Sequence, residues 1–230
     1  MAQTNDTIEV YLEEGKKKTI AGALDWPGWA RIGRDEEAAL AALVDYGERY
    51  GRVLEKTDIT FRPPADFSEL VVVERLEGNA TTDFGAPDIA PSADDQPVDE
   101  AEHQRFEAIL EACWQAFDEA VVAAEGKTLR KGPRGGGREL EGIMEHVLGA
   151  DRSYLSTLGW KYKRDKRLGL QKAMEECQTA ILDGLAAAVR GELPKEGPRG
   201  GKRWSARYYV RRSAWHVLDH VWEIEDRVEQ

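Results

Sequence analysis

The fold of the second half of this chain is decided by the stretch Ser213-Ala214-Trp215-His216-Val217-Leu218-Asp219-His220-Val221-Trp222-Glu223-Ile224-Glu225-Asp226-Arg227. It carries two of the four histidines, His216 and His220, which are four residues apart. With about 3.6 residues per helical turn, this spacing puts both imidazoles on one helix face. Two imidazoles there can bind a borderline metal ion, although such a pair alone is more often an ordinary feature of a helix surface. The metal interpretation therefore needs a third ligand.

His146 is the candidate for that third ligand. It lies in a helix expected from Glu139 to about Leu158, with Gly142 four residues before it and Gly149 three residues after it. Glycine inside a helix costs about 1 kcal/mol relative to alanine, so two glycines beside one histidine indicate that this face needs space. We expect an inward imidazole beside a cavity, and tight helix packing is the alternative. The fourth histidine, His103, is predicted at the surface and not as a ligand.

Apolar residues recur with helical period in four segments of the second half. The expected helices cover about 99–125, 139–158, a segment around 170–185, and 205–227. Together they predict an all-α four-helix bundle over residues 99–230. Cys113 and Cys177 fall on the apolar stripes of the first and third helices, so we interpret them as core residues rather than catalytic thiols.

Two loops with the same Gly-Pro-Arg-Gly-Gly sequence precede the helices that bear histidine. The arginines in and just after these loops can form an anion-binding rim, helped by the helix N-termini, and they are Arg134, Arg138, Arg199 and Arg203. Alternatively, glycine and proline only set the turns, and the arginines meet water or acidic side chains.

The N-terminal part is predicted to be a small α+β domain, residues 1–78, with the element order β-β-β-α-β. Apolar and polar residues alternate over Thr7–Glu13, which indicates a half-buried strand. Further strands are expected at 19–24, 30–33 and 70–76. Asp35 is the expected N-cap of a helix that runs towards Tyr50.

The segment 79–98 is rich in Gly, Ala, Pro, Asp and Ser and keeps no helix or strand period. We therefore predict a linker between two domains. Phe84 and Ile89 are apolar points that could pin it to a surface, and a passive tether is the alternative.

The chain of 230 residues has a formal net charge of −11. An acidic chain lacks the positive field that nucleic acids and anionic membranes require, so we expect neither as a partner. The two cysteines form no CxxC pair, which excludes a zinc knuckle. The N-terminus has no signal-peptide pattern, and no apolar run reaches the roughly 18 residues of a membrane span. These features predict a soluble, cytoplasmic protein.

One histidine in the second helix and a His-x-x-x-His pair in the fourth resemble the DinB/YfiT-like superfamily of four-helix-bundle metalloenzymes. The segment from His146 to Leu155 also resembles the second-helix pattern of that family, and the resemblance covers about residues 99–228. It implies that His146, His216 and His220 bind a divalent metal ion, and it also implies a homodimer. Zinc, nickel and iron all accept imidazole, and the sequence does not choose among them.

A second resemblance covers about residues 7–76. The turn Asp25-Trp26-Pro27-Gly28, followed by Gly33 and the acidic, alanine-rich segment from Asp35 to Leu40, resembles the HicB-like family. Members of that family are antitoxins, often with a DNA-binding segment. No basic helix-turn-helix is visible in this chain, so the resemblance supports the fold more than the antitoxin role.

Three imidazoles on one ion leave at least one position for water or substrate. Water bound there can ionise near neutral pH and attack a carbonyl or phosphoryl centre, or a thiolate can displace it. Glu223 follows His220 by one turn, and Asp151 and Tyr154 lie beyond His146. These three are the candidate catalytic residues, as proton carriers or as groups that orient the rings.

The leading hypothesis is a metal-dependent enzyme of hydrolase or thiol-dependent transferase type, with a small-molecule substrate that the sequence does not identify. One alternative is a non-catalytic interaction module stabilised by its metal. Another is an antitoxin-like regulator that acts through the N-terminal domain.

Overall fold

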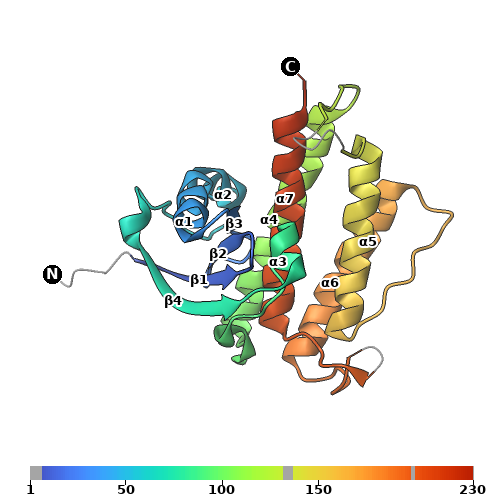
Figure 1. Ribbon diagram of the computed structural model, residues 1–230. Coiled ribbons are helices and arrows are strands. Elements are labelled where there is room, and N and C mark those ends of the chain that lie inside the picture. Colours follow the sequence, from blue (N-terminus) through green and yellow to red (C-terminus); the bar gives the residue numbers. More distant parts are fainter. Residues whose placement is uncertain (1–6, 132–136, 198–199, 230) are drawn as a thin grey trace. The chain divides into compact units, whose positions relative to one another are not determined.

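The computed structural model describes residues 7–131, 137–197 and 200–229. The chain divides into two compact units, one up to Gln96 and one from Pro97. The first contains a small mixed sheet and the second is mostly helical (Figure 1). Each unit is described by itself.

Within the described residues, the first unit has a four-stranded sheet in the order β3-β2-β1-β4. Strands β1, β2 and β3 form an antiparallel meander, and β4 returns parallel to β1. The strands are β1 Ile8–Glu14, β2 Thr19–Ala23, β3 Ala30–Gly33 and β4 Leu70–Glu77. All four lie within one residue of the predicted positions.

Strand β1 is not half-buried as its alternation predicted. Val10, Tyr11, Leu12 and Glu13 are all buried. Side chains alternate between the two faces of a strand, so both faces of β1 are covered.

The single helix predicted from Asp35 towards Tyr50 is divided at Tyr46. Its two parts are α1 Glu36–Asp45 and α2 Gly47–Leu54, which lie on one side of the sheet (Figure 1). The Leu43 carbonyl, which a continuous helix would offer to the amide of residue 47, accepts the indole N–H of Trp29 at 2.9 Å. The start of the helix is as predicted, because the Asp35 side chain accepts the Ala38 amide at 2.9 Å.

The segment predicted as an unstructured linker contains a short helix, so the expectation of no helical period was wrong there. Helix α3, Ala80–Phe84, begins with an Asn79 capping box, and a 3-10 turn follows at Ser92–Asp95. Phe84 is 72% exposed, so its side chain is not buried against a surface as the prediction allowed. The segment is instead held by the buried Glu13 carboxylate.

Glu13 accepts the Thr82 hydroxyl at 2.5 Å and the backbone amides of Asp88 and Ile89 at 3.0–3.2 Å. Burial raises the pKa of this carboxyl, and the hydrogen bonds oppose that rise. A fully buried carboxylate on a central strand thus fastens the chain beyond β4 to the sheet.

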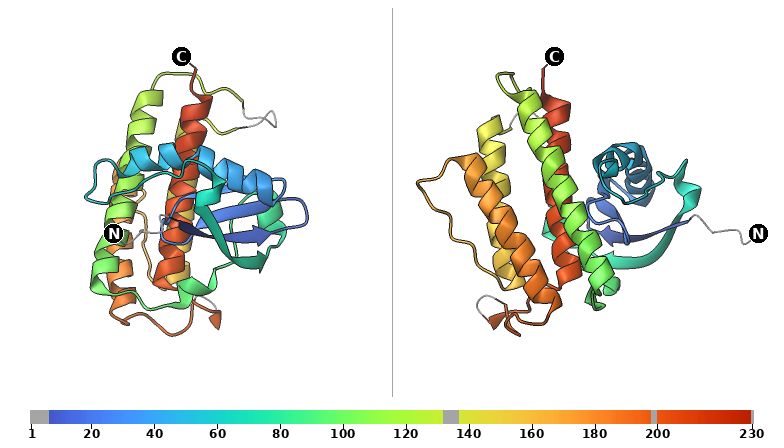
Figure 2. Two further views of the ribbon diagram at one scale, coloured as in Figure 1. Left: turned by 90° about the vertical axis from the view of Figure 1, so that its left-hand side faces the viewer. Right: turned by 180° about the vertical axis from the view of Figure 1, so that it is seen from behind.

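Four long helices form the second unit in the described residues, and their ends match the predicted ones closely. They are α4 Glu100–Ala124, α5 Leu140–Leu158, α6 Leu170–Val189 and α7 Ala206–Arg227. Helix α7 packs against both α4 and α5, and α5 packs against α6 (Figure 2). Ser205 caps α7 by accepting the Tyr208 amide at 3.1 Å.

The apolar stripes predicted for these helices form the core of the unit. Phe106, Phe117 and Ile181 are fully buried, and both cysteines are free and buried. Burial raises the pKa of both thiols, which removes the thiolate that catalysis would need. Among the described residues, no helix combines the length and apolarity that crossing a membrane requires.

Candidate metal centre

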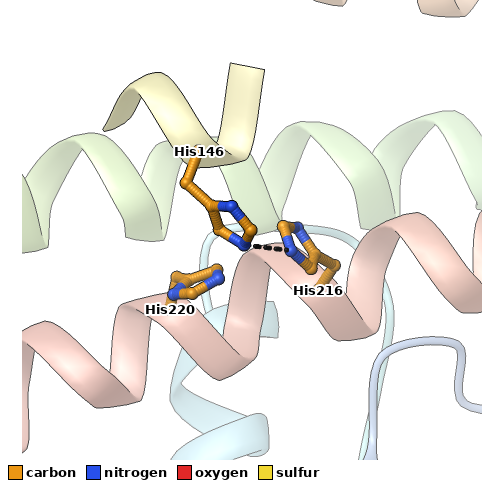
Figure 3. A group of neighbouring side chains, drawn as sticks. All are labelled: His146, His216 and His220. Atoms are coloured by element: carbon orange, nitrogen blue, oxygen red, sulfur yellow. Dashed lines mark hydrogen bonds between the residues drawn. The ribbon is translucent and has the colours of Figure 1, made fainter. Parts of the chain in front are cut away.

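Three histidines from two neighbouring helices meet in the second unit (Figure 3). His146 comes from α5, and His216 and His220 come from adjacent turns of α7. Their ligand nitrogens all lie within 4.8 Å of one another. The Nε2 atoms of His146 and His216 are 3.2 Å apart. The three rings therefore converge on one point, as predicted.

The spacing of the ligand nitrogens fits a divalent ion that accepts imidazole. Zinc–nitrogen bonds are about 2.0–2.1 Å, so two ligands of a tetrahedral ion lie about 3.3 Å apart. The 3.2 Å between His146 and His216 matches that separation. No carboxylate or thiolate among the described residues joins the group. Three imidazoles and no other protein ligand are the donor set of a zinc, nickel or iron site with an open position.

The local electrostatics favour the neutral imidazole at His146 and His216. Burial is the main cause that lowers the pKa of His216 well below its ordinary value, and the positive charges of neighbouring groups add to it. The pKa of the half-buried His146 is lowered for the same reasons. A neutral imidazole has a free lone pair, so a metal ion does not have to displace a proton.

Glu223 orients the ring of His220. Its Oε2 lies 2.7 Å from Nδ1 of His220, and this hydrogen bond is the main cause that lowers the pKa of the Glu223 carboxyl. An ionised carboxylate only accepts, so Nδ1 of His220 must carry the proton. In the neutral imidazole this tautomer leaves Nε2 unprotonated and available to a metal ion.

Arg227 holds Glu223 in turn, and the sequence reasoning missed this residue. Its Nη1 donates to Oε1 of Glu223 at 2.5 Å, and its other nitrogens donate to the carbonyls of Arg130 and Arg138 at 2.7 and 3.0 Å. A Cβ at Gly137 would lie 2.4 Å from the Arg227 guanidinium, which explains the small residue there. The sequence signal that could have predicted this ion pair is the Glu-x-x-x-Arg spacing, which places both side chains on one helix face.

Tyr154 and Asp151 have different surroundings. The Tyr154 ring meets the His216 ring edge-on, with 5.6 Å between centroids. Asp151 is buried on another side of α5, where its charge interacts with Cys177 and Tyr209. Burial raises the pKa of Asp151 to about 7, and its Oδ1 has no hydrogen-bond partner among the described residues. The structure brings Tyr154 to the cluster and leaves Asp151 outside it.

Arg138 and Arg203, the two predicted rim residues that the structure describes, lie near opposite ends of α5. Arg138 precedes α5, and its charge reaches His146 and His216. Arg203 donates to the carbonyl of Leu158 at the far end of α5, which is about 28 Å long. Arg134 and Arg199 lie outside the described residues. Of the two described arginines, Arg138 is therefore the one that adjoins the histidine cluster.

The two glycines beside His146 have different surroundings. A Cβ at Gly149 would meet nothing within 4 Å, so this glycine borders open space on α5. A Cβ at Gly142 would lie 3.2 Å from Cβ of Arg138, so that position is tightly packed. His103 was predicted at the surface, but it is 8% exposed and lies near Glu107 on its own helix. It is not part of the histidine group.

Arg212 is a further neighbour that the sequence reasoning missed. It precedes His216 by one turn of α7 and is 8% exposed. Its guanidinium carbon lies 4.9 Å from the centre of the Tyr154 ring and 4.6 Å from that of Trp215. An arginine four residues before a candidate ligand shares its helix face, which was the available signal.

No protein family model matches this chain, and no curated protein or solved structure matches it either. The residues of the cluster and their surroundings therefore carry the functional proposal.

Proposed function

We propose that the helical unit is a metal-dependent enzyme of hydrolase or thiol-dependent transferase type, with α4–α7 arranged as a DinB-like four-helix bundle. The observation that carries the proposal is the convergence of His146, His216 and His220 at the spacing of ligands to one ion. The proposed ion is divalent zinc, nickel or iron.

The side chains have separable tasks in this proposal. His146 and His216 supply neutral nitrogens, because burial opposes their protonation. Glu223 fixes the tautomer of His220 and is a positioning residue. A bound divalent ion would supply Lewis acidity towards a carbonyl or phosphoryl oxygen, or would hold a thiolate for transfer. Tyr154, beside His216, is the group placed to contact a substrate.

The donor set favours a catalytic site over a structural one. Structural zinc sites are closed by four protein ligands, whereas catalytic sites use three and keep one position open. Within the described residues the cluster has three. The open space beside Gly149 lies on the same helix as His146 and gives a small molecule room to approach.

The site is tested by metal analysis of the purified full chain and of His146→Ala and His216→Ala. His103→Ala is the matched control, because it removes a buried histidine outside the cluster. We expect one divalent ion per chain in the wild type and the control and none in the two cluster variants. Unchanged metal content in both cluster variants would show that the three histidines do not bind the metal.

The open position is tested with cobalt(II) in place of the native metal. We expect the visible spectrum of the cobalt protein to change when a small thiol such as 2-mercaptoethanol is added, because a thiolate enters the open position. A spectrum that keeps its tetrahedral form and does not respond to thiol would favour the alternative of a metal-stabilised interaction module.

A further inference from the structure

Arg212 is a buried cation beside the three-histidine cluster. It shares a face of α7 with His216, and Tyr154 contacts both, since its ring lies against the guanidinium and against the His216 ring. The centre of the Trp215 ring lies 4.6 Å from the guanidinium carbon. All of these residues belong to the helical unit.

No hydrogen bond or ion pair joins the Arg212 guanidinium to any other residue that the structure describes, and its Nη1 atom is buried without a partner. Other arginines of the same helix differ in this respect. Arg207 is paired with Glu102, and Arg227 is paired with Glu223. The helix thus places one unpaired cation next to its metal-binding histidines.

An unpaired buried guanidinium calls for an anion from outside the chain. Arginine does not release its proton in proteins, so the group stays charged when it is buried. Burial of an unpaired charge is strongly unfavourable, and contacts with two aromatic rings offset only part of that cost. A divalent ion at the histidines would add further positive charge one helical turn away. An anionic group on the ligand would neutralise this local excess.

We propose that the substrate of the three-histidine site carries a carboxylate and that Arg212 binds this carboxylate as the specificity-determining residue. This inference rests on the proposed function for the identity of the site. The guanidinium edge presents parallel N–H groups that match the two oxygens of a carboxylate. The same fork also pairs with phosphate, so the comparison of butyrate with butyl phosphate is part of the test.

The position of Arg212 also sets the shape of a suitable ligand. Arg212 and His216 are one helical turn apart, which is about 5.4 Å along the axis. The carboxylate and the group that reaches the metal should therefore be separated by a short chain. A molecule with a thiol at one end, three methylene groups and a carboxylate at the other end meets this requirement, and 4-mercaptobutyrate is such a molecule.

The experiment measures the dissociation constants of 4-mercaptobutyrate and of its uncharged methyl ester for the cobalt-loaded full chain, from the thiolate-to-cobalt absorption. We expect the wild type to bind the acid at least tenfold more tightly than the ester, as charge-assisted hydrogen bonds to a buried guanidinium require. In Arg212→Met the acid should lose this advantage, and the affinity for the ester should stay within twofold.

Two matched variants distinguish a direct contact between Arg212 and the carboxylate from a general effect of positive charge near the histidines. Arg138→Met removes another positive charge that reaches the histidines but lies outside the cluster, so the preference for the acid should persist. Arg212→Lys keeps the charge without the fork and should keep part of the preference. Equal loss in Arg138→Met and Arg212→Met, or no preference in the wild type, would overturn the proposal. Tighter binding of butyl phosphate than of butyrate in the wild type would overturn the choice of carboxylate.

Calorimetric titration of the metal-free chain with butyrate distinguishes the two proposals from each other. Arg212-dependent binding of butyrate by a chain that binds no cobalt would leave the carboxylate site standing while the metal-dependent function fails. Cobalt binding without any preference for the acid would leave the metal-dependent function standing while the carboxylate site fails. In both cases Arg212→Met should be at least as stable as the wild type without ligand, because it removes an unpaired buried charge.

Discussion

Replacement of Glu223 by glutamine should weaken metal binding although Glu223 is not itself a ligand. The carboxylate accepts the Nδ1 proton of His220 through Oε2 at 2.7 Å and the Arg227 guanidinium through Oε1 at 2.5 Å. It therefore serves two donors at once, and Glu223→Gln keeps its size while it turns one of its two acceptor atoms into a donor.

Either orientation of the new amide is unfavourable for metal binding. With its oxygen towards His220, its NH2 group faces the donor nitrogen of Arg227. With its oxygen towards Arg227, its NH2 group faces Nδ1 of His220, which must then accept, so the ring proton moves to Nε2 and blocks the metal. The second arrangement keeps both contacts when no metal is bound, so metal binding forces the first one and loses the charge-assisted hydrogen bond from Arg227, roughly 1.5–3 kcal/mol. We therefore expect a dissociation constant for zinc that is roughly 10–100-fold higher, which agrees with typical effects of groups that support metal ligands.

The assay is competition for zinc between the full chain and a chelating dye at pH 7.5. Glu225→Gln is the control, because it removes an exposed carboxylate two residues further along the same helix. Its affinity should stay within twofold of the wild type. The reasoning is refuted when Glu223→Gln also binds zinc within twofold of the wild type, or when both variants lose affinity equally.

Three further predictions concern the helical unit. The pKa values of His146 and His216 are lowered in the fold, so the unfolded chain binds protons more readily at these two positions. Their contribution to the stability of the metal-free protein should therefore fall as pH drops below about 6.5 and stay constant above it; urea unfolding of the wild type and of His146→Ala and His216→Ala between pH 5 and 8 measures the difference. Gly149→Ala should stabilise the protein by up to about 1 kcal/mol without loss of metal, because the new methyl group meets no neighbour, and a lower urea midpoint would contradict that account. Asp151→Asn should be more stable than the wild type, because burial raises the pKa of the Asp151 carboxyl to about 7. The difference in the free energy of unfolding should grow between pH 4 and 7, by up to about 1.4 kcal/mol per pH unit. A difference that does not depend on pH would contradict this prediction.

Local signals in the sequence predicted the elements well where short-range chemistry decides them. The Asp35 cap, the Ser205 start of α7 and the glycine turn at Gly28, with its φ of 96°, depend on residues only a few positions apart. The spacing of His216 and His220 likewise fixes their shared face, because the period of a helix is a property of the backbone.

Other features could not be read from neighbouring residues. The division of α1 from α2 depends on Trp29, which reaches the Leu43 carbonyl across the fold. The buried Glu13 on β1 depends on Thr82, far away along the chain. A local pattern of apolar and polar residues carries no information about partners that are distant in the sequence. This explains why the segment 79–98 was expected to be only a linker.

The candidate metal centre combines both kinds of information. The sequence by itself determined which residue types were available, the face that His216 and His220 share, and through a family resemblance the choice of His146. Of the two glycines beside His146, Gly149 borders open space and Gly142 packs against the Arg138 side chain. Only the packing of α5 against α7 brings the Nε2 atoms of His146 and His216 to 3.2 Å, across 70 positions of the chain. Tertiary structure also decided that Arg227 contacts both Glu223 and the Arg138 carbonyl before α5. It likewise left Arg212 without a counter-ion among the described residues. The physical reason is that the charges around a buried group come from helices that pack together in space.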